Sequence, residues 1–201
     1  MAHGQIASAR QERRAWVVEG AVALAAAYAL AVSARFRVTV PLSPVPITGQ
    51  TLTVLLIGAL MPRRAGLAAV GAYLVGGALG LPLFAGGSLA GPTGGYLLGF
   101  VACVWLVSTL TEPRTGVGRR PGNYSASGTV GVGAARALLV LLAGSAVIYA
   151  FGLPWLAVFV GWDRVLPLGL LPFVVGDALK LVCALTVVVA RTHLRRGGKT
   201  L

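Results

Sequence analysis

The sequence predicts an all-α integral membrane protein, a compact bundle of six transmembrane helices. Composition is the first observation: 57% of the 201 residues are hydrophobic and only 11% are charged, whereas a typical soluble domain is about 25% charged. The second observation is that the apolar residues form six runs, separated by basic, Pro-rich or Gly-rich segments. The third is that the 17 Lys and Arg residues are distributed asymmetrically around those runs.

The predicted spans follow the apolar runs in chain order. They cover residues 16–33, 50–61, 65–81, 95–111, 131–151 and 172–192. The stretch before the first span is polar and basic, and it lacks the cleavage context of a signal peptide. We therefore expect three parts. These are a cytoplasmic N-terminal tail (1–15), one membrane domain (16–192) and a basic cytoplasmic C-terminal tail (193–201).

Basic residues predict the orientation of the spans. With the N-terminus in the cytoplasm, twelve of the 17 Lys and Arg residues flank the spans on the inner side, and only Arg35, Arg37 and Arg164 lie outside. Such an excess on the inner side is the positive-inside rule, and it predicts an even number of spans with both termini cytoplasmic. The net charge of +12 thus indicates a lipid bilayer rather than a nucleic-acid partner. The inner connection 112–130 is polar, and we expect it to be mobile.

Three outer connections are too rich in proline and glycine to form regular helix. Residues 39–49 contain three prolines within six positions. The span after them, 50–61, rises only about 18 Å, against a hydrocarbon core of about 30 Å. Residues 80–95 and 152–171 have the same apolar, interrupted character. Because non-helical backbone at membrane depth is tolerated only against protein or beside a cavity, we expect irregular lid loops over a pocket that opens outward.

One charged pair stands in the last span, where every other residue from 171 to 190 is apolar or small. Asp177 and Lys180 are three positions apart, so they share one helix face. A charge inside a bilayer costs about 2.5–3.5 kcal/mol even on the mildest scale. The pair is therefore either a structural salt bridge or the floor of a binding site, and both roles can coexist. A proton relay would use several intramembrane acids or histidines, and only Asp177 qualifies.

The sequence contains no signature of several other function classes. It has no G-x-x-x-x-G-K-[ST] motif for ATP hydrolysis and no H-E-x-x-H motif for zinc. No Ser/His/Asp grouping suits nucleophilic catalysis. We therefore expect a protein that is not an enzyme and that needs neither a cofactor nor a metal.

Four motifs follow one another along the chain: PVPITGQTL (44–52), GLPLFAGG (80–87), GPTGGYLLGF (91–100) and GDALK (176–180). Together they resemble those of BioY, the biotin-binding substrate component (S component) of energy-coupling factor (ECF) transporters. The resemblance covers residues 16–191 and departs from the family at Gly49, where a larger apolar residue is expected.

The resemblance implies that this chain captures biotin in the cell membrane of a prokaryote. It also implies three partners, a coupling transmembrane subunit and two ATPase subunits, which supply the ATP hydrolysis that this chain lacks. A small-residue motif on the first span docks the coupling subunit in the family. Here that motif falls on Ala23 and Ala27.

The resemblance also implies which residues bind biotin. Asp177 would accept a ureido N–H, and Lys180 would donate either to the ureido carbonyl or to the tail carboxylate. Apolar walls would come from Phe84 and Tyr96. Further polar candidates are Thr48, Gln50, Ser88 and Thr93. Simpler roles stay open for three of these residues: Thr93 as a helix cap, Tyr96 as an interfacial residue and Gln50 as the start of a span.

Two other functions fit the same architecture. One is binding of a different vitamin, or of a biotin precursor such as dethiobiotin. The other is a solitary biotin transporter or facilitator that works without an ECF module. Competition binding separates the first from biotin capture, and uptake by this chain alone indicates the second.

Overall fold

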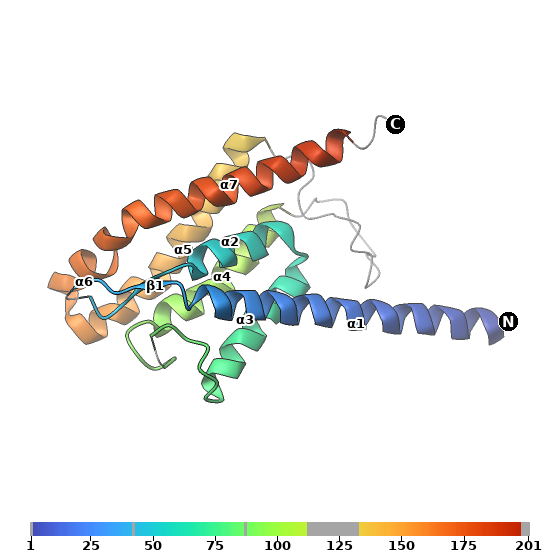
Figure 1. Ribbon diagram of the computed structural model, residues 1–201, viewed down its shortest axis with the longest axis horizontal. Coiled ribbons are helices and arrows are strands. Elements are labelled where there is room, and N and C mark those ends of the chain that lie inside the picture. The colour runs from blue at the N-terminus through green and yellow to red at the C-terminus, as the bar shows by residue number, and fades with distance from the viewer. Residues whose placement is uncertain (1, 42, 87, 112–132, 198–201) are drawn as a thin grey trace.

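The described part of the protein is mostly helical (Figure 1). The structure, a computed structural model, describes residues 2–41, 43–86, 88–111 and 133–197. Its elements, in chain order, are α1 (Ala2–Ser33), β1 (Arg37–Val38), β2 (Ile47–Thr48), α2 (Gln50–Leu60), α3 (Arg63–Ala78), α4 (Gly94–Thr111), α5 (Ala134–Val160), α6 (Trp162–Gly169), the 3₁₀ helix η1 (Leu171–Phe173) and α7 (Val174–Gly197). The connection predicted at 112–130 lies outside the described residues.

Each of the six predicted spans corresponds to one helix, namely α1 to α5 and α7. Helix α1 begins at Ala2 rather than at residue 16, because the polar segment before the span is rich in Ala, Arg, Gln and Glu, which are good helix formers. Within the described part of the chain, four helical segments are long and apolar enough to cross a membrane. They are Arg10–Ser33, Gly94–Thr111, Ala134–Val160 and Trp162–Leu194. The predicted class of helical membrane protein is confirmed at this level.

The outward surface of these helices is apolar, as contact with lipid requires. The side chains of Leu24, Tyr28, Leu139, Val158 and Leu179 are all exposed by more than 60%. An apolar surface of this extent, distributed over α1, α5 and α7, is rare on soluble monomers. It supports a bilayer as the solvent of the bundle.

Residues 152–171 were predicted to form an irregular outer connection, and that prediction is wrong. Helix α5 continues through Pro154 to Val160, and α6 and η1 follow. The helix tolerates this proline because its second half is held by neighbours: Trp155 Nε1 donates to Gly91 O at 2.9 Å, and Leu156 is fully buried. The break comes instead at Gly161, whose φ of +83° favours glycine.

In the other two outer connections, the described residues before α2 and before α4 form no helix, as predicted. In the first, β1 pairs antiparallel with β2, with Arg37 opposite Thr48 and Val38 opposite Ile47. Ser43 Oγ donates to Leu168 O of α6 at 2.7 Å. Arg35 Nη2 donates to Pro82 O in the second connection at 2.7 Å. The outer segments are therefore joined to one another. Figure 1 shows β1 and α6 at the end of the molecule opposite the first turns of α1 and the last turns of α7.

Helices α4 and α5 form the most extensive helix pair of the bundle. Small residues allow the two backbones to approach closely. A Cβ at Gly95 would lie 2.3 Å from Trp155 Cβ and 2.5 Å from Phe151 O. Around this pair, α2 packs on α4, α7 packs on α2 and α5, and α1 packs on α3. Arg191 of α7 donates to Leu60 O at 2.8 Å, which links α7 to the last turn of α2.

The close approach of α4 and α5 predicts that Gly95→Ala destabilises the protein. The new methyl group has no room, and overpacking of this kind costs about 1–3 kcal/mol. Gly20→Ala on α1 is the matched control, since nothing lies within 4 Å of its Cβ position. We expect the midpoint of thermal unfolding in detergent to fall for Gly95→Ala and to stay equal or rise for Gly20→Ala. Equal midpoints for the two variants would contradict this packing.

Candidate ligand-binding site

A cavity lies among α2, α4, α5 and α7 beneath the outer connections. Its empty space, which includes open solvent at the mouth, is about 550 Å³. Apolar side chains form most of its wall, and a few polar groups converge on it. The lining residues are Val45, Pro46, Thr48, Gln50, Thr51, Ala85, Gly86, Thr93, Tyr96, Leu97, Phe100, Ile148, Tyr149, Phe173, Asp177 and Lys180.

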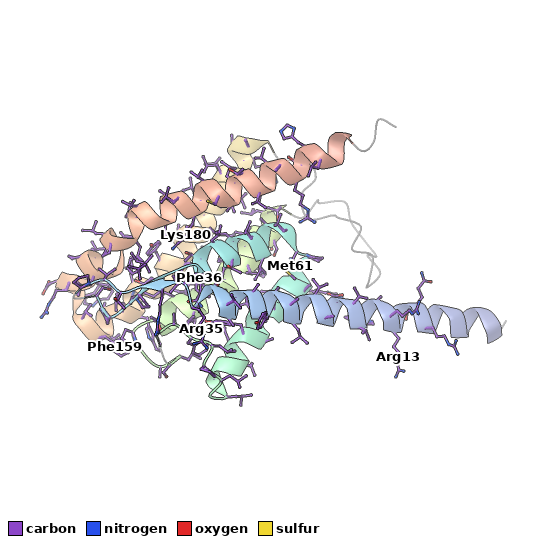
Figure 2. All side chains as sticks on the ribbon, in the orientation of Figure 1. Arg13, Arg35, Phe36, Met61, Phe159 and Lys180 are labelled. Atoms are coloured by element: carbon purple, nitrogen blue, oxygen red, sulfur yellow. The ribbon has the colours of Figure 1, made fainter. Side chains whose placement is uncertain are left out.

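Asp177 and Lys180 form an ion pair in this lining. Lys180 Nζ lies 2.8 Å from Asp177 Oδ1, and the two side chains are only 15% and 13% exposed. Figure 2 shows Lys180 on the side of α7 that faces the other helices. Asp177 stands in the first turn of α7, where the positive end of the helix dipole favours a carboxylate. The pair predicted from the sequence is therefore turned toward the cavity and away from lipid.

Two hydroxyl groups complete the environment of the carboxylate. Tyr149 OH of α5 donates to Asp177 Oδ2, and Thr51 Oγ1 of α2 lies 3.5 Å from Oδ1. Both carboxylate oxygens thus have donors before any ligand arrives. The Lys180 ammonium has three N–H groups, and Asp177 is its one acceptor among the described residues. Lys180 therefore keeps donor capacity for an oxygen atom in the cavity.

A second polar group joins the cavity to α3. Gln50 Nε2 donates to Tyr73 OH, and Tyr73 OH donates to Leu83 O at 3.3 Å. Thr48 Oγ1 donates to Gln50 Oε1 at 3.2 Å. Both ends of the Gln50 amide are therefore engaged within the protein. This chain of hydrogen bonds ties the start of α2 to the connection that follows α3.

Thr93 is the exception in a cavity whose other polar groups are paired. Its side chain is 8% exposed, and its hydroxyl has no hydrogen-bond partner among the described residues. It directly precedes α4, but the unpaired hydroxyl shows that it is not a side-chain cap. A Cβ at Gly86 would lie 2.5 Å from Thr93 Oγ1, so only glycine lets the connection pass this close. An unpaired buried hydroxyl costs about 1–3 kcal/mol, and a ligand in the cavity can pair it.

Tyr96 is buried, and both its hydroxyl group and its ring contact other residues of the bundle. Its OH donates to Gly169 O at 2.8 Å, and its ring meets Tyr149 edge-on with centroids 6.1 Å apart. The side chain is 9% exposed. Tyr96 is therefore a wall residue of the cavity, not an interfacial one.

Six of the eight ligand-binding residues named from the sequence line the cavity, and two do not. Phe84 is buried with its ring 5.3 Å from that of Tyr73, so it packs behind the wall. Ser88 is exposed, and its Oγ accepts from Ala90 N at 3.1 Å. Sequence reasoning missed Tyr149 and Thr51. Tyr149 had a signal, a phenol in the apolar outer half of a span, and Thr51 adjoins Gln50 within the first motif.

Ala23 and Ala27, the predicted docking residues, lie inside the chain's own bundle. They are 5% and 9% exposed, and their helix packs chiefly on α3. Their small size allows that packing. Docking of a coupling subunit at these two positions stays a prediction.

The fold and the cavity define the class: a helical membrane protein that binds a small molecule with polar and apolar parts. Among the described residues, no group of three His, Cys, Asp or Glu is placed to hold a metal ion. The family model described as "BioY family" matches residues 8–197. The chain therefore belongs to the BioY family.

Two relatives and one solved structure illustrate this membership. A probable biotin transporter BioY of Pyrococcus horikoshii is 33% identical over 171 residues, covering 83% of this chain and 92% of the relative. The biotin transporter BioY of Thermotoga maritima is 37% identical over 153 residues, covering 73% and 80%. The crystal structure of an S-component for biotin from an ECF-type ABC transporter has the same fold. Its TM-score is 0.64 at 20% identity, with 93% of each chain covered.

The ion pair predicts energetic coupling between positions 177 and 180. We expect Asp177→Asn and Lys180→Met each to lower the thermal midpoint of the ligand-free protein, because each leaves an unpaired charge in a poorly solvated site. The double variant should lose less than the sum of the two, with a coupling of about 1 kcal/mol or more. Asp163→Asn, on the exposed face of α6, is the control partner for Lys180→Met and should be additive. Additivity at 177 and 180 would show that the two charges do not stabilise each other.

Proposed function

We propose that this chain captures biotin on the outer side of a prokaryotic cell membrane, as the substrate-binding subunit of an ECF-type importer. The observation that carries the proposal is the Asp177–Lys180 pair in the wall of an otherwise apolar cavity. Membership of a family whose relatives are named biotin transporters supports it. No chemical conversion of biotin is involved, since the role is binding and delivery.

The chemistry of biotin suits this cavity. Its ureido group offers two N–H donors and a carbonyl acceptor, its fused ring with a thioether is apolar, and its tail ends in a carboxylate. Lys180 has donor capacity for an oxygen. The two carboxylate oxygens of Asp177 accept hydrogen bonds from three donors within the protein. A carboxylate has about four lone-pair sites, so it can accept about one more hydrogen bond from a ligand. Phe100, Ile148 and Phe173 supply apolar wall.

Six membrane crossings with both termini inside are part of the proposal. Helices α2 and α3 are the short crossings, since their 11 and 16 residues rise about 17 and 24 Å. The missing depth belongs to the irregular connections, whose backbone lies against protein and the cavity. The start of α1 and the end of α7 lie at the same end of the molecule (Figure 1). This arrangement supports an even number of crossings.

Import by this subunit requires energy that its own sequence does not supply. The chain has no nucleotide-binding motif, so the proposal includes a coupling transmembrane subunit and two ATPase subunits. The fold shared with an S-component of an ECF-type ABC transporter supports this assembly. Uptake of biotin by cells that express this chain without an ECF module would instead favour a solitary transporter.

The decisive test is the identity of the ligand that the protein carries. The protein is purified in detergent, and small molecules released by denaturation are identified by mass spectrometry. We expect biotin. Retention of a different vitamin, with no binding of added biotin, would overturn the proposal.

Loss of either charge should weaken biotin binding. We expect Asp177→Asn and Lys180→Ala each to lower the affinity by at least about tenfold, because a hydrogen bond to a charged group contributes about 1.5–3 kcal/mol. Isothermal titration of the purified variants with biotin measures this. Arg164→Gln, which removes an exposed charge of α6, should leave the affinity unchanged. Wild-type affinity in both pair variants would refute the assignment of the site.

The unpaired hydroxyl of Thr93 predicts a smaller effect. Thr93→Val keeps the shape of the side chain and removes the hydrogen-bonding group. We expect biotin affinity to fall about three- to tenfold, while the thermal midpoint of the empty protein stays the same or rises. The control is Thr186→Val on α7, whose exposed hydroxyl donates to Val182 O of its own helix at 2.9 Å. An equal loss of affinity in both variants would mean that Thr93 does not contact the ligand.

A further inference from the structure

A second cavity lies against the first, on its outer side, and we call it the outer vestibule. Its lining residues are Arg37, Thr39, Ser43, Pro44, Pro46, Ala85 and Gly86, and its empty space, counted into open solvent, is about 690 Å³. Pro46, Ala85 and Gly86 also line the inner cavity. The two spaces therefore adjoin along these three residues, and the vestibule is the wider and more open of the two.

Arg37 gives the vestibule its charge. It is the one charged residue in the lining, and it stands on β1 with its side chain exposed. Its Nη1 donates to Ala85 O at 3.0 Å, which fixes the guanidinium at the boundary between the two cavities. A guanidinium has five N–H donors, and this carbonyl is its one partner among the described residues. The others are available to an incoming molecule.

The inner cavity has no net charge to attract an anion from a distance. Lys180 and Asp177 are 2.8 Å apart, so their fields largely cancel beyond a few ångströms. The carboxylate is held in place by Tyr149 and Thr51 and does not leave the ammonium uncovered. Of the two cavities, the vestibule is therefore the one whose lining carries a net charge that attracts an anion.

We propose that the outer vestibule is an encounter site for a small monocarboxylate, in which Arg37 attracts the anionic group before the molecule enters the inner cavity. The inference rests on the proposed function, since biotin is a monocarboxylate at neutral pH. Arg37 acts on the rate of capture, while the Asp177–Lys180 pair acts on retention. Charges at the rim of a site change the association rate and its salt dependence more than the dissociation rate.

The expected effect follows from the distance over which one charge acts. At roughly 10 mM salt the Debye length is about 30 Å, and at 1 M it is about 3 Å. We expect Arg37→Gln to lower the association rate constant of biotin about two- to threefold at the lower salt concentration and not at the higher one. The dissociation rate constant should be unchanged at both.

The measurement is stopped-flow tryptophan fluorescence on the full chain in nanodiscs of zwitterionic lipid, with biotin and uncharged biotinamide as ligands. Arg37→Lys keeps the charge and should restore the wild-type rate. Arg13→Gln is the control, since Arg13 is an exposed charge on the part of α1 that lies far from β1 and the vestibule (Figure 2). Biotinamide should associate equally fast with the wild type and with Arg37→Gln.

Three results would overturn the inference while biotin binding stands. They are an unchanged association rate in Arg37→Gln, an equal reduction in Arg13→Gln, and a changed dissociation rate alone, which would place Arg37 in the bound complex. A wild-type protein that binds no biotin would instead overturn the proposed function, and the inference with it. The equilibrium titration of the wild type separates these cases before any variant is compared.

Discussion

The Asp177–Lys180 pair is the interaction on which the arrangement of the site depends. Two charges in a largely apolar bundle persist only if each finds compensation, and the partners here come from three helices: Thr51 of α2, Tyr149 of α5 and the pair itself on α7. These contacts fix the rotation of α7, because turning its polar face away would expose both charges to lipid. A requirement of the membrane environment thereby places the polar face of the last helix against the cavity.

The rest of the cavity follows from the same requirement, that polar groups away from water need hydrogen-bond partners. Non-helical backbone must lie against protein, so the two irregular connections are held by Arg35, Ser43 and Tyr73, which bond to backbone carbonyls. These bonds hold the two connections over the outer end of the bundle without filling the space beneath them. Thr93 is left with an unsatisfied hydroxyl at the cavity wall, which is expected where a ligand rather than the protein supplies the partner.

The helices and the charged pair could be predicted from the sequence because both depend on the energetics of single residues. These are the cost of a charge in lipid and the loss of helix at clustered prolines. Sequence reasoning failed where tertiary contacts decide. Pro154 does not end α5, since Trp155 and Leu156 hold the turn beyond it. Phe84 turns toward Tyr73 and not toward the cavity, because the direction of a side chain in an irregular connection depends on the path of the backbone. Tyr149 was missed because its contact with Asp177 depends on how α5 is rotated against α7.

The neutralisation of the Lys180 charge by Asp177 also affects how readily a capture protein can release its ligand. A bare ammonium in an apolar cavity would hold an anion through an interaction that is strong and slow to break. With Asp177 beside it, Lys180 offers directed hydrogen bonds but little net field, so affinity depends on a ligand that fits both the polar groups and the apolar walls. Recognition inside and attraction outside are then separate properties, carried by residues in different elements, and a change in one need not alter the other.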